Sequence, residues 1–484
     1  MQHLTTQPDL WQIEGKHRGE QQISLERVFE WSFNRLTDAQ QHLLSQISVL
    51  RGAFNPEAAT AVADRPVSDA DLHDLERRSL LQELPEQDKH GLKPYRLQPR
   101  IQSFAQKRAG DVTEVHQRAI AHFWNQRRTE VAATDEIDAV SEYLETFYHQ
   151  VCLGRYSDAA VTVFACDQFL RRRGYDSTLV ELYSPLHTDW QPTAEEEQDY
   201  SAVCNNLGYA YQPLGQYQRA IDLHEQALSI AQKIGSHGGK ATSLNHLGNV
   251  YDSLRQYPRA IEFFEQALAI KQEIGDRHGE GMSLNNLGNV YHSLGQYPRA
   301  IEFFEQALAI KQEIGDRGGE SNSLGNLGNA YNALGQYPQA IKFYDQALDI
   351  QQKIGNRHGA ANAWFNLGIA KANLGELEAA IPAYQRAREL YAAMGIGYWV
   401  EQCDEAIREV GQVIAMRQRV APTIGDPLPA QPDWHAKSLP SSPKSVTASK
   451  KPQTSSRISL PLWLWFAVGL AGVVLVWWVK SIKN

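Results

Sequence analysis

The sequence predicts a mainly α protein: a solenoid of helix pairs, preceded by a small α+β domain and followed by a disordered linker and one transmembrane helix. Three observations predict this order. A motif repeats every 40 residues between positions 201 and 400, a stretch rich in proline and serine follows it, and residues 458–479 carry no charge. A fixed internal period indicates a stacked repeat architecture rather than one compact core.

A Leu-Gly pair marks each copy of the repeat and recurs without slippage. The pairs are Leu207-Gly208, Leu247-Gly248, Leu287-Gly288, Leu327-Gly328 and Leu367-Gly368. Residues 241–280 and 281–320 differ at six of 40 positions, which indicates a recent duplication. Identity between these two copies therefore says little about function.

Each copy has the pattern of two antiparallel helices. In the copy at 281–320, Leu284, Leu287 and Tyr291 fall on one helical face. Gly295 is placed to end the first helix, and Pro298 to stand in the first turn of the second. Gly288 is expected where two helices approach closely. Small alanines that alternate with bulky side chains then let the helices interdigitate.

The L-G-x-x-Y, A-x-x-x-[FYH] and A-[LR] spacing resembles the tetratricopeptide repeat (TPR) family. The 40-residue period is similar to the extended repeats of kinesin light chains and of spindle-orientation scaffolds. The resemblance covers five repeats at 201–400, followed by an expected capping helix at 401–418. It implies that the first helices line a concave groove that binds a protein or an extended peptide.

Asparagine recurs at the positions that contact bound peptide in this family, on both sides of the Leu-Gly pair. Since asparagine is a poor helix former, this row predicts amides that bond to a peptide backbone. The alternative is that the amides bond to neighbouring repeats or were copied by duplication. The residues before the pair are Asn206, His246, Asn286, Asn326 and Asn366, and those after it are Asn249, Asn289 and Asn329.

A second candidate binding feature is the Gly-Asp-Arg motif between repeats. Arg277, Arg317 and Arg357 are predicted to line one rim of the groove and to bind carboxylates. The alternative is a local Asp–Arg cap at the end of each second helix, and the sequence favours it.

Residues 23–109 are predicted to form a small domain of helices and a hairpin. Thr37 with Gln40 forms a capping box, Asn55 precedes Pro56 at another helix start, and Asp69 opens a third helix. The segments LERVFEWSFNRL, VLRGAF, LERRSLL and YRLQPRIQSFAQ resemble the winged-helix domain of STAND-type signalling ATPases. No phosphate-binding loop occurs, and the family's histidine is Gln98 here, so nucleotide is not expected to bind.

The regions that flank this domain carry weaker patterns. Residues 1–22 are expected to be flexible, and residues 110–200 are predicted to form degenerate helical repeats, because Leu153-Gly154 and Ala159-Ala160 repeat the TPR spacing. Residues 23–109 contain 12 basic and 12 acidic residues, so they provide no field that would attract phosphates. Nucleic acid is therefore not an expected partner, and the domain is expected to serve as a docking cap.

The C-terminal end predicts a membrane anchor. Residues 419–457 are expected to be a disordered linker, since 421–457 alone hold seven prolines and seven serines. The 22 uncharged residues at 458–479 are long enough to cross a membrane, with tryptophans near both ends. Excess lysine before the span predicts a tail-anchored, single-pass protein whose soluble domains face the cytoplasm.

These observations favour a membrane-anchored scaffold that binds a partner in the TPR groove. The alternative is a signalling or regulatory remnant of a STAND-type ATPase, whose winged helix docks protein or DNA. A net charge of −9 argues against a general nucleic-acid binder. No arrangement of catalytic residues is recognisable, the four cysteines are scattered, and therefore neither an enzyme nor a cofactor or metal is expected.

Overall fold

The structure is a computed structural model, and it describes residues 27–85, 93–130 and 136–420. Two compact units divide the described chain, one up to Tyr175 and one from Asp176 onward. The predicted flexible segment 1–22, the predicted linker from residue 421 and the predicted span at 458–479 lie outside the described residues.

The first unit is built from short helices and a small sheet. A helix covers residues 27–34. The elements that follow are α2 (Asp38–Ile47), β1 (Ala53–Phe54), α3 (Pro56–Val62), α4 (Asp69–Arg77), β2 (Gln82–Glu83), β3 (Tyr95–Arg96), α5 (Pro99–Arg108), α6 (Thr113–Gln126), a 3₁₀ turn (Ile137–Val140), α7 (Ser141–Cys152) and α8 (Tyr156–Arg172). Leu44, Ile47 and Leu72 lie in its core with no exposed surface.

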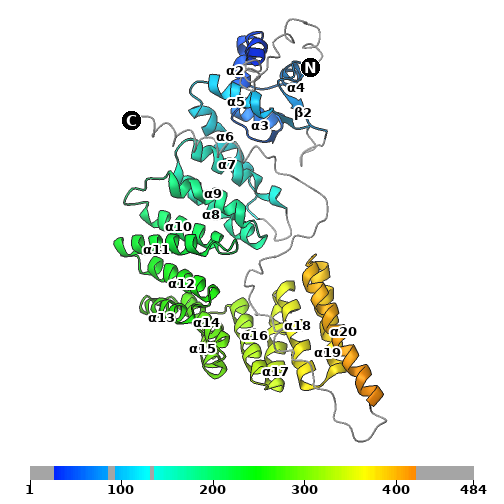
Figure 1. The fold of residues 1–484 in the computed structure, drawn as a ribbon. Coiled ribbons are helices and arrows are strands. Elements are labelled where there is room, and N and C mark those ends of the chain that lie inside the picture. The colour runs from blue at the N-terminus through cyan, green and yellow to red at the C-terminus, as the bar shows by residue number, and fades with distance from the viewer. Residues whose placement is uncertain (1–26, 86–92, 131–135, 421–484) are drawn as a thin grey trace, which may run out of the picture. The chain divides into compact units, whose positions relative to one another are not determined.

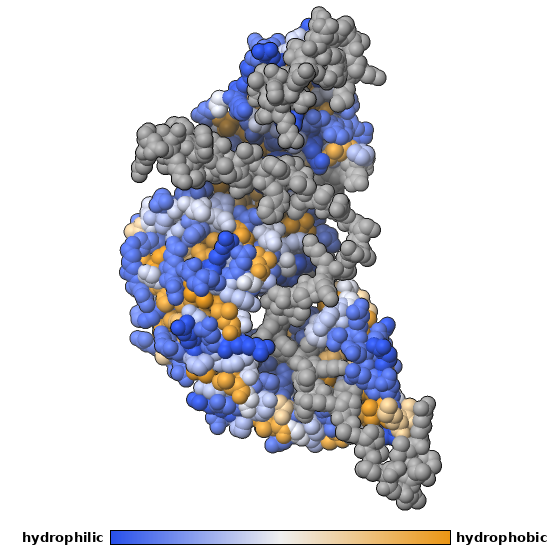
Figure 2. All heavy atoms as spheres, viewed as in Figure 1, coloured by the Kyte–Doolittle hydropathy of each residue, from blue (hydrophilic) through white to orange (hydrophobic). Residues whose placement is uncertain are grey.

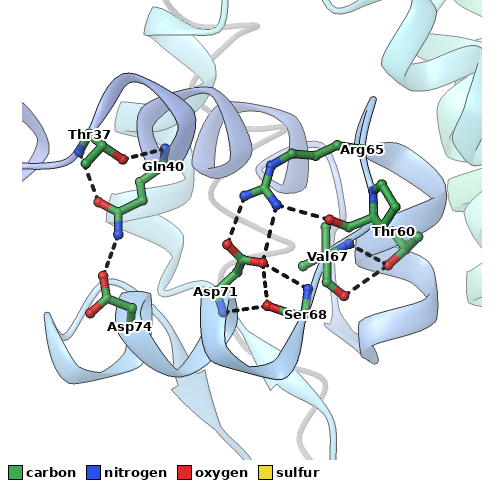
Figure 3. A network of polar contacts seen from close by, with 9 residues as sticks. Thr37, Gln40, Thr60, Arg65, Val67, Ser68, Asp71 and Asp74 are labelled. Carbon is green, nitrogen blue, oxygen red and sulfur yellow. Dashed lines mark hydrogen bonds and ion pairs between the residues drawn. The ribbon is translucent and has the colours of Figure 1, made fainter.

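The helix starts in this unit form as the sequence predicts. Thr37 and Gln40 make a reciprocal capping box before α2, and Asn55 accepts a hydrogen bond from the backbone of α3. Ser68 caps α4, and Arg65 holds the Asp71 carboxylate there with two hydrogen bonds of 2.9 and 3.3 Å (Figure 3). These contacts lower the pKa of Asp71, led by the bond from Arg65.

The sheet has the order β1-β3-β2, and both pairings are antiparallel. The hairpin of β2 and β3 was predicted, whereas β1 was not. Gln82 and Ala53 lie on opposite sides of Arg96, and Glu83 lies directly across from Tyr95. Each strand spans only two residues, so the predicted α+β region is itself mainly helical.

The second unit begins with α9 (Asp176–Thr188) and continues as five helix pairs. The first helices are α10 (Glu197–Tyr211), α12 (His237–Ser253), α14 (Arg277–Ser293), α16 (Arg317–Ala333) and α18 (Arg357–Leu374). The second helices are α11 (Tyr217–Lys233), α13 (Tyr257–Glu273), α15 (Tyr297–Glu313), α17 (Tyr337–Lys353) and α19 (Leu377–Ala393). Helix α20 (Gly397–Val420) covers α19, as the expected capping helix does, and the order can be followed in Figure 1.

The Leu-Gly glycine creates the close packing inside each pair. A Cβ on Gly288 would lie 2.5 Å from the ring of Phe304, and one on Gly328 would lie 2.5 Å from the ring of Tyr344. The aromatic ring of the second helix therefore rests on the bare backbone of the first. The sequence predicted a close approach of two helices, and the structure shows that a ring makes the contact.

Successive first helices contact one another along the array, because α10, α12, α14, α16 and α18 each meet the next one. Successive second helices come less close together among the described residues. A stack that is tighter on one side curves toward that side, so the first helices form its inner, concave layer. The predicted groove therefore falls on the exposed edge of these helices.

The predicted fold class is corrected in one further respect. No helix of the described residues is both long enough and apolar enough to cross a membrane. Helix α13 buries Ala260, Phe264 and Ala267 and exposes Glu262, Glu265 and Gln266 between them, and hydrophilic residues are interspersed with hydrophobic ones over the face seen in Figure 2. The fold is therefore a mainly α solenoid, and the predictions of a transmembrane helix and of a single-pass membrane location are withdrawn.

Candidate partner-binding groove

The predicted asparagine row lies on the first helices, in the inner layer of the array. Asn206 is on α10, His246 on α12 and Asn286 on α14, and all three side chains are half-buried. Asn326 on α16 and Asn366 on α18 are buried, with 3% and 2% of their surface exposed. The row is thus one feature in sequence but has two environments.

Amides before the Leu-Gly pair join neighbouring repeats. Asn286 donates from Nδ2 to Oδ1 of Asn245 at 3.1 Å, and Asn326 donates in the same way to Asn285 at 2.9 Å. Donor and acceptor stand 41 residues apart in both cases. These bonds are the alternative that the sequence left open, and they tie each first helix to the next.

The asparagine after the Leu-Gly pair has a partner in the fourth repeat. Asn329 accepts at Oδ1 from the Tyr344 hydroxyl at 2.7 Å and from Asn366 Nδ2 at 3.2 Å. Tyr344 is buried, so this hydrogen bond satisfies a hydroxyl that water does not reach. At this repeat the amide has a structural role.

The equivalent residues of the second and third repeats differ. Asn249 and Asn289 are half-buried, and neither side chain hydrogen-bonds to any described residue. The second helices carry Phe264 and Phe304 where the fourth repeat has Tyr344, and phenylalanine has no hydroxyl to donate. Their amides are therefore available to a partner in the groove.

The first repeat replaces the aromatic ring with a histidine. His224 is fully buried and donates from Nδ1 to Oδ1 of Asn205 at 3.0 Å, while its Nε2 lies 3.2 Å from Nε2 of Gln212. Its ring stacks on His246 with centroids 5.0 Å apart. Burial, and then the charge of His246, place the pKa of His224 well below its usual value.

The arginines are held by glutamates rather than by the neighbouring aspartate. Arg277 contacts Glu280 and reaches Glu313 with both Nε, at 3.3 Å, and Nη2, and these bonds raise its pKa. Arg317 contacts Glu320 in the same way. Asp276 instead caps α14 by accepting from the backbone of Gly279 at 2.9 Å. The predicted Asp–Arg cap is thus wrong in its partners.

Arg357 stands apart from the other two arginines. It is exposed and makes no ion pair with a described residue. Asn356 caps α18 beside it by accepting from Gly359 at 3.0 Å. A role of all three arginines as a common carboxylate-binding rim stays a prediction.

Two kinds of hydrogen bond on the first helices were not predicted from the sequence. Asn205, Asn245 and Asn285 accept or donate across repeats, although only the next residue of each copy was singled out. The Tyr344 hydroxyl was missed as well. Its signal was the exchange of phenylalanine for tyrosine at one position of the repeat.

Five such helix pairs, each with a histidine, phenylalanine or tyrosine ring seated on the Leu-Gly glycine, form an array of TPR repeats. The tetratricopeptide repeat family matches the chain at residues 200–273, 270–313 and 319–393. These matches lie within α10 to α19 and confirm the TPR resemblance of the sequence.

Several solved structures are similar to this chain. One is a Signal Transduction ATPase with Numerous Domains (STAND) protein with a tetratricopeptide repeat sensor from Pyrococcus horikoshii, at 17% identity and a TM-score of 0.41, covering 79% of this chain and 65% of that one. This chain thus spans less than two thirds of the STAND protein's length. No curated protein sequence matches the chain.

Two further structures match over most of their own length. A putative kinesin light chain with nearly identical TPR-like repeats from Podospora anserina shares 25% identity and a TM-score of 0.37, covering 42% of this chain and 99% of that one. A Rap protein complexed with competence and sporulation factor shares 13% identity and a TM-score of 0.38, covering 63% and 99%.

Proposed function

We propose that this protein is a protein-interaction scaffold, and not an enzyme, whose TPR groove binds an extended segment of a partner. The amides of Asn249 and Asn289 are proposed to hold the partner's backbone. Each amide can donate one hydrogen bond and accept another, so the pair can bind a peptide without reading its side chains.

One observation carries this proposal. Asparagine inside a helix is less favourable than alanine by about 0.7 kcal/mol. In the fourth repeat, bonds to Tyr344 and Asn366 offset that cost. In the second and third repeats no described residue does so, and the amides lie half-buried in the inner layer. Since these two repeats are near-copies, their asparagines count as one observation.

Peptide selection with the full chain tests the proposal. Peptides selected from a random library would be titrated by fluorescence anisotropy against the wild type and an Asn249→Ala/Asn289→Ala variant. Two lost hydrogen bonds of roughly 0.5–1.5 kcal/mol each should weaken binding about tenfold or more. The fold should not suffer, because alanine favours helix.

A matched control comes from the outer layer of the same array. Gln266 lies on α13, is exposed, and donates a hydrogen bond to Glu262 at 3.4 Å. Gln266→Ala should leave peptide affinity unchanged. Equal affinity of the wild type and the double variant, with equal melting temperatures, would remove the amides from the binding site.

The alternative role, a signalling remnant of a STAND-type ATPase, would place docking of protein or DNA at residues 23–109. Crosslinking of the selected peptides distinguishes the two roles. Crosslinks to α12 and α14 favour the groove, whereas crosslinks to residues 23–109 favour the remnant.

A further inference from the structure

Three side chains with metal-binding atoms converge within the first unit. His73 and Glu76 lie three residues apart on α4, so both project from one helical face. Glu83 comes from β2. One ligand atom from each residue lies within 4.8 Å of the other two. No pattern in the sequence predicted this group, because it forms only when the fold brings the strand residue to the helix.

The backbone fixes which nitrogen of His73 can bind a ligand. Nδ1 lies 3.1 Å from the carbonyl oxygen of Asp69, which can only accept a hydrogen bond. Nδ1 therefore carries the proton, and in the neutral ring Nε2 keeps its lone pair. The Tyr95 hydroxyl lies 3.2 Å from the same Nδ1. Histidines that bind metals are oriented in this way, with the other ring nitrogen held by a second group.

The lone pair of Nε2 faces a carboxylate at an unusual distance. Nε2 of His73 lies 3.7 Å from Oε2 of Glu83, which is too long for a hydrogen bond. Two ligands about 2.1 Å from a tetrahedral zinc ion stand roughly 3.4 Å apart. The observed separation is thus close to the separation that a shared ion requires.

The charges around the group also favour a cation. Lys93 contacts Oε1 of Glu83 and leaves Oε2 turned to His73. The group's two carboxylates, Glu76 and Glu83, thus have the one ammonium group of Lys93 beside them.

We propose that His73, Glu76 and Glu83 bind a zinc ion. One imidazole and two carboxylates are suitable zinc ligands, and water completes the coordination because His73 is half-exposed. An ion at this position links α4 to β2 and so stabilises the edge of the sheet.

Zinc titration of the full chain tests the site. Isothermal titration calorimetry of chelator-treated protein with ZnCl₂ should show saturable binding with one ion per chain. Glu83→Gln and Glu76→Gln each remove one ligand with little change of shape, and each should weaken binding at least tenfold. Cobalt offers a second readout, since its visible absorption reports nitrogen and oxygen ligands at the same three residues.

His42 provides the matched control. It is an exposed histidine of the same unit, and its Nε2 lies 2.9 Å from the Asp64 carboxylate in a simple pair. His42→Gln should leave zinc affinity unchanged. The proposal is overturned if wild type shows no saturable binding, or if both glutamate variants bind zinc as tightly as wild type. The latter result would mean that His73 and Glu83 form only an ion pair.

Discussion

The ring that rests on the Leu-Gly glycine differs by one hydroxyl group between the second and third repeats and the fourth, and that hydroxyl changes the role of an asparagine. Phe264 and Phe304 leave Asn249 and Asn289 without a side-chain partner in the described chain, whereas Tyr344 binds Asn329 at 2.7 Å. A conserved-looking row of residues within one chain can therefore combine structural and surface positions. The side chain 15 residues further on decides which of the two a given asparagine is.

The packing of an aromatic ring on the Leu-Gly glycine is common to both kinds of repeat. Disrupting it should have the largest effect on stability. Gly288→Val and Gly328→Val each push a branched side chain into the space of Phe304 or Tyr344. Overpacking of this kind should lower the free energy of unfolding by about 1–3 kcal/mol or more. Chemical denaturation measures it, and the two variants should behave alike.

Gly318 gives the control for that prediction. It lies on α16, and a Cβ there would meet only Asp316 Oδ1, at 3.7 Å. Gly318→Val should change stability by no more than about 0.5 kcal/mol. A large loss of stability in Gly318→Val too would show that any side chain at a helical glycine disturbs the array. The contact between the ring and the Leu-Gly glycine would then not explain the effect.

The next largest difference in stability should be that between alanine variants of Asn329 and of the two asparagines without a side-chain partner in the described chain. Asn329→Ala removes the acceptor of the buried Tyr344 hydroxyl and of Asn366, and should cost about 1–3 kcal/mol. Asn249→Ala and Asn289→Ala should leave stability unchanged or raise it slightly, because alanine favours helix. Thermal melting of the three single variants tests this. Three equal melting temperatures would end the distinction between the repeats.

In the first repeat, a histidine takes the place of the ring, so the stability of this repeat should depend on pH. Burial depresses the pKa of His224 in the folded state, while the unfolded chain takes up its proton near pH 6.5. Below that pH the unfolded state binds more protons than the folded state. The free energy of unfolding should therefore fall as pH drops below about 6.5, by up to about 1.4 kcal/mol per pH unit.

His224→Phe gives the first repeat the ring of the next two, and it should flatten this slope. Denaturation at pH 7.5, 6.5 and 5.5 compares the variant with wild type. His237→Gln, at an exposed position of α12, should keep the wild-type slope. An unaltered slope in His224→Phe would assign the pH dependence to other histidines.

Replacing either of two buried tyrosines by phenylalanine should have the smallest effect on stability, and the two variants should differ from each other. Tyr344→Phe loses a hydrogen bond to Asn329 and should cost about 0.5–1.5 kcal/mol. Tyr384 is equally buried, but its hydroxyl has no partner in the described part of the chain, because Ile369 replaces the asparagine. Tyr384→Phe should be neutral or slightly stabilising. Equal losses for both variants would contradict the structural role of the amide.

The sequence predicted the repeats and much of their local chemistry. The Leu-Gly period located all five helix pairs, and Gly295 ends its helix with a φ of +73°, as a left-handed cap requires. The capping residues Thr37 and Asn55 were also predicted. These features depend on neighbours in sequence, which a pattern of residues records directly.

The partners of the candidate binding residues could not be predicted in the same way. Arg277 pairs with Glu313, 36 residues away, and no local pattern distinguishes this from a pair with Asp276. The group of His73, Glu76 and Glu83 likewise depends on where β2 packs. The strand β1 was missed because two residues are too few to show alternation.

The hydrogen bonds between asparagine side chains of successive first helices affect how such a chain can change in length. Both bonds join the same two positions of successive copies, so Asn245 could accept a hydrogen bond from Asn326 as well as it accepts one from Asn286. Recombination between the near-identical stretches 241–280 and 281–320 would remove or add one whole copy and leave these junctions intact. The array can thus lengthen or shorten by one helix pair in a single genetic event, and the length of peptide that the proposed groove accommodates would change with it.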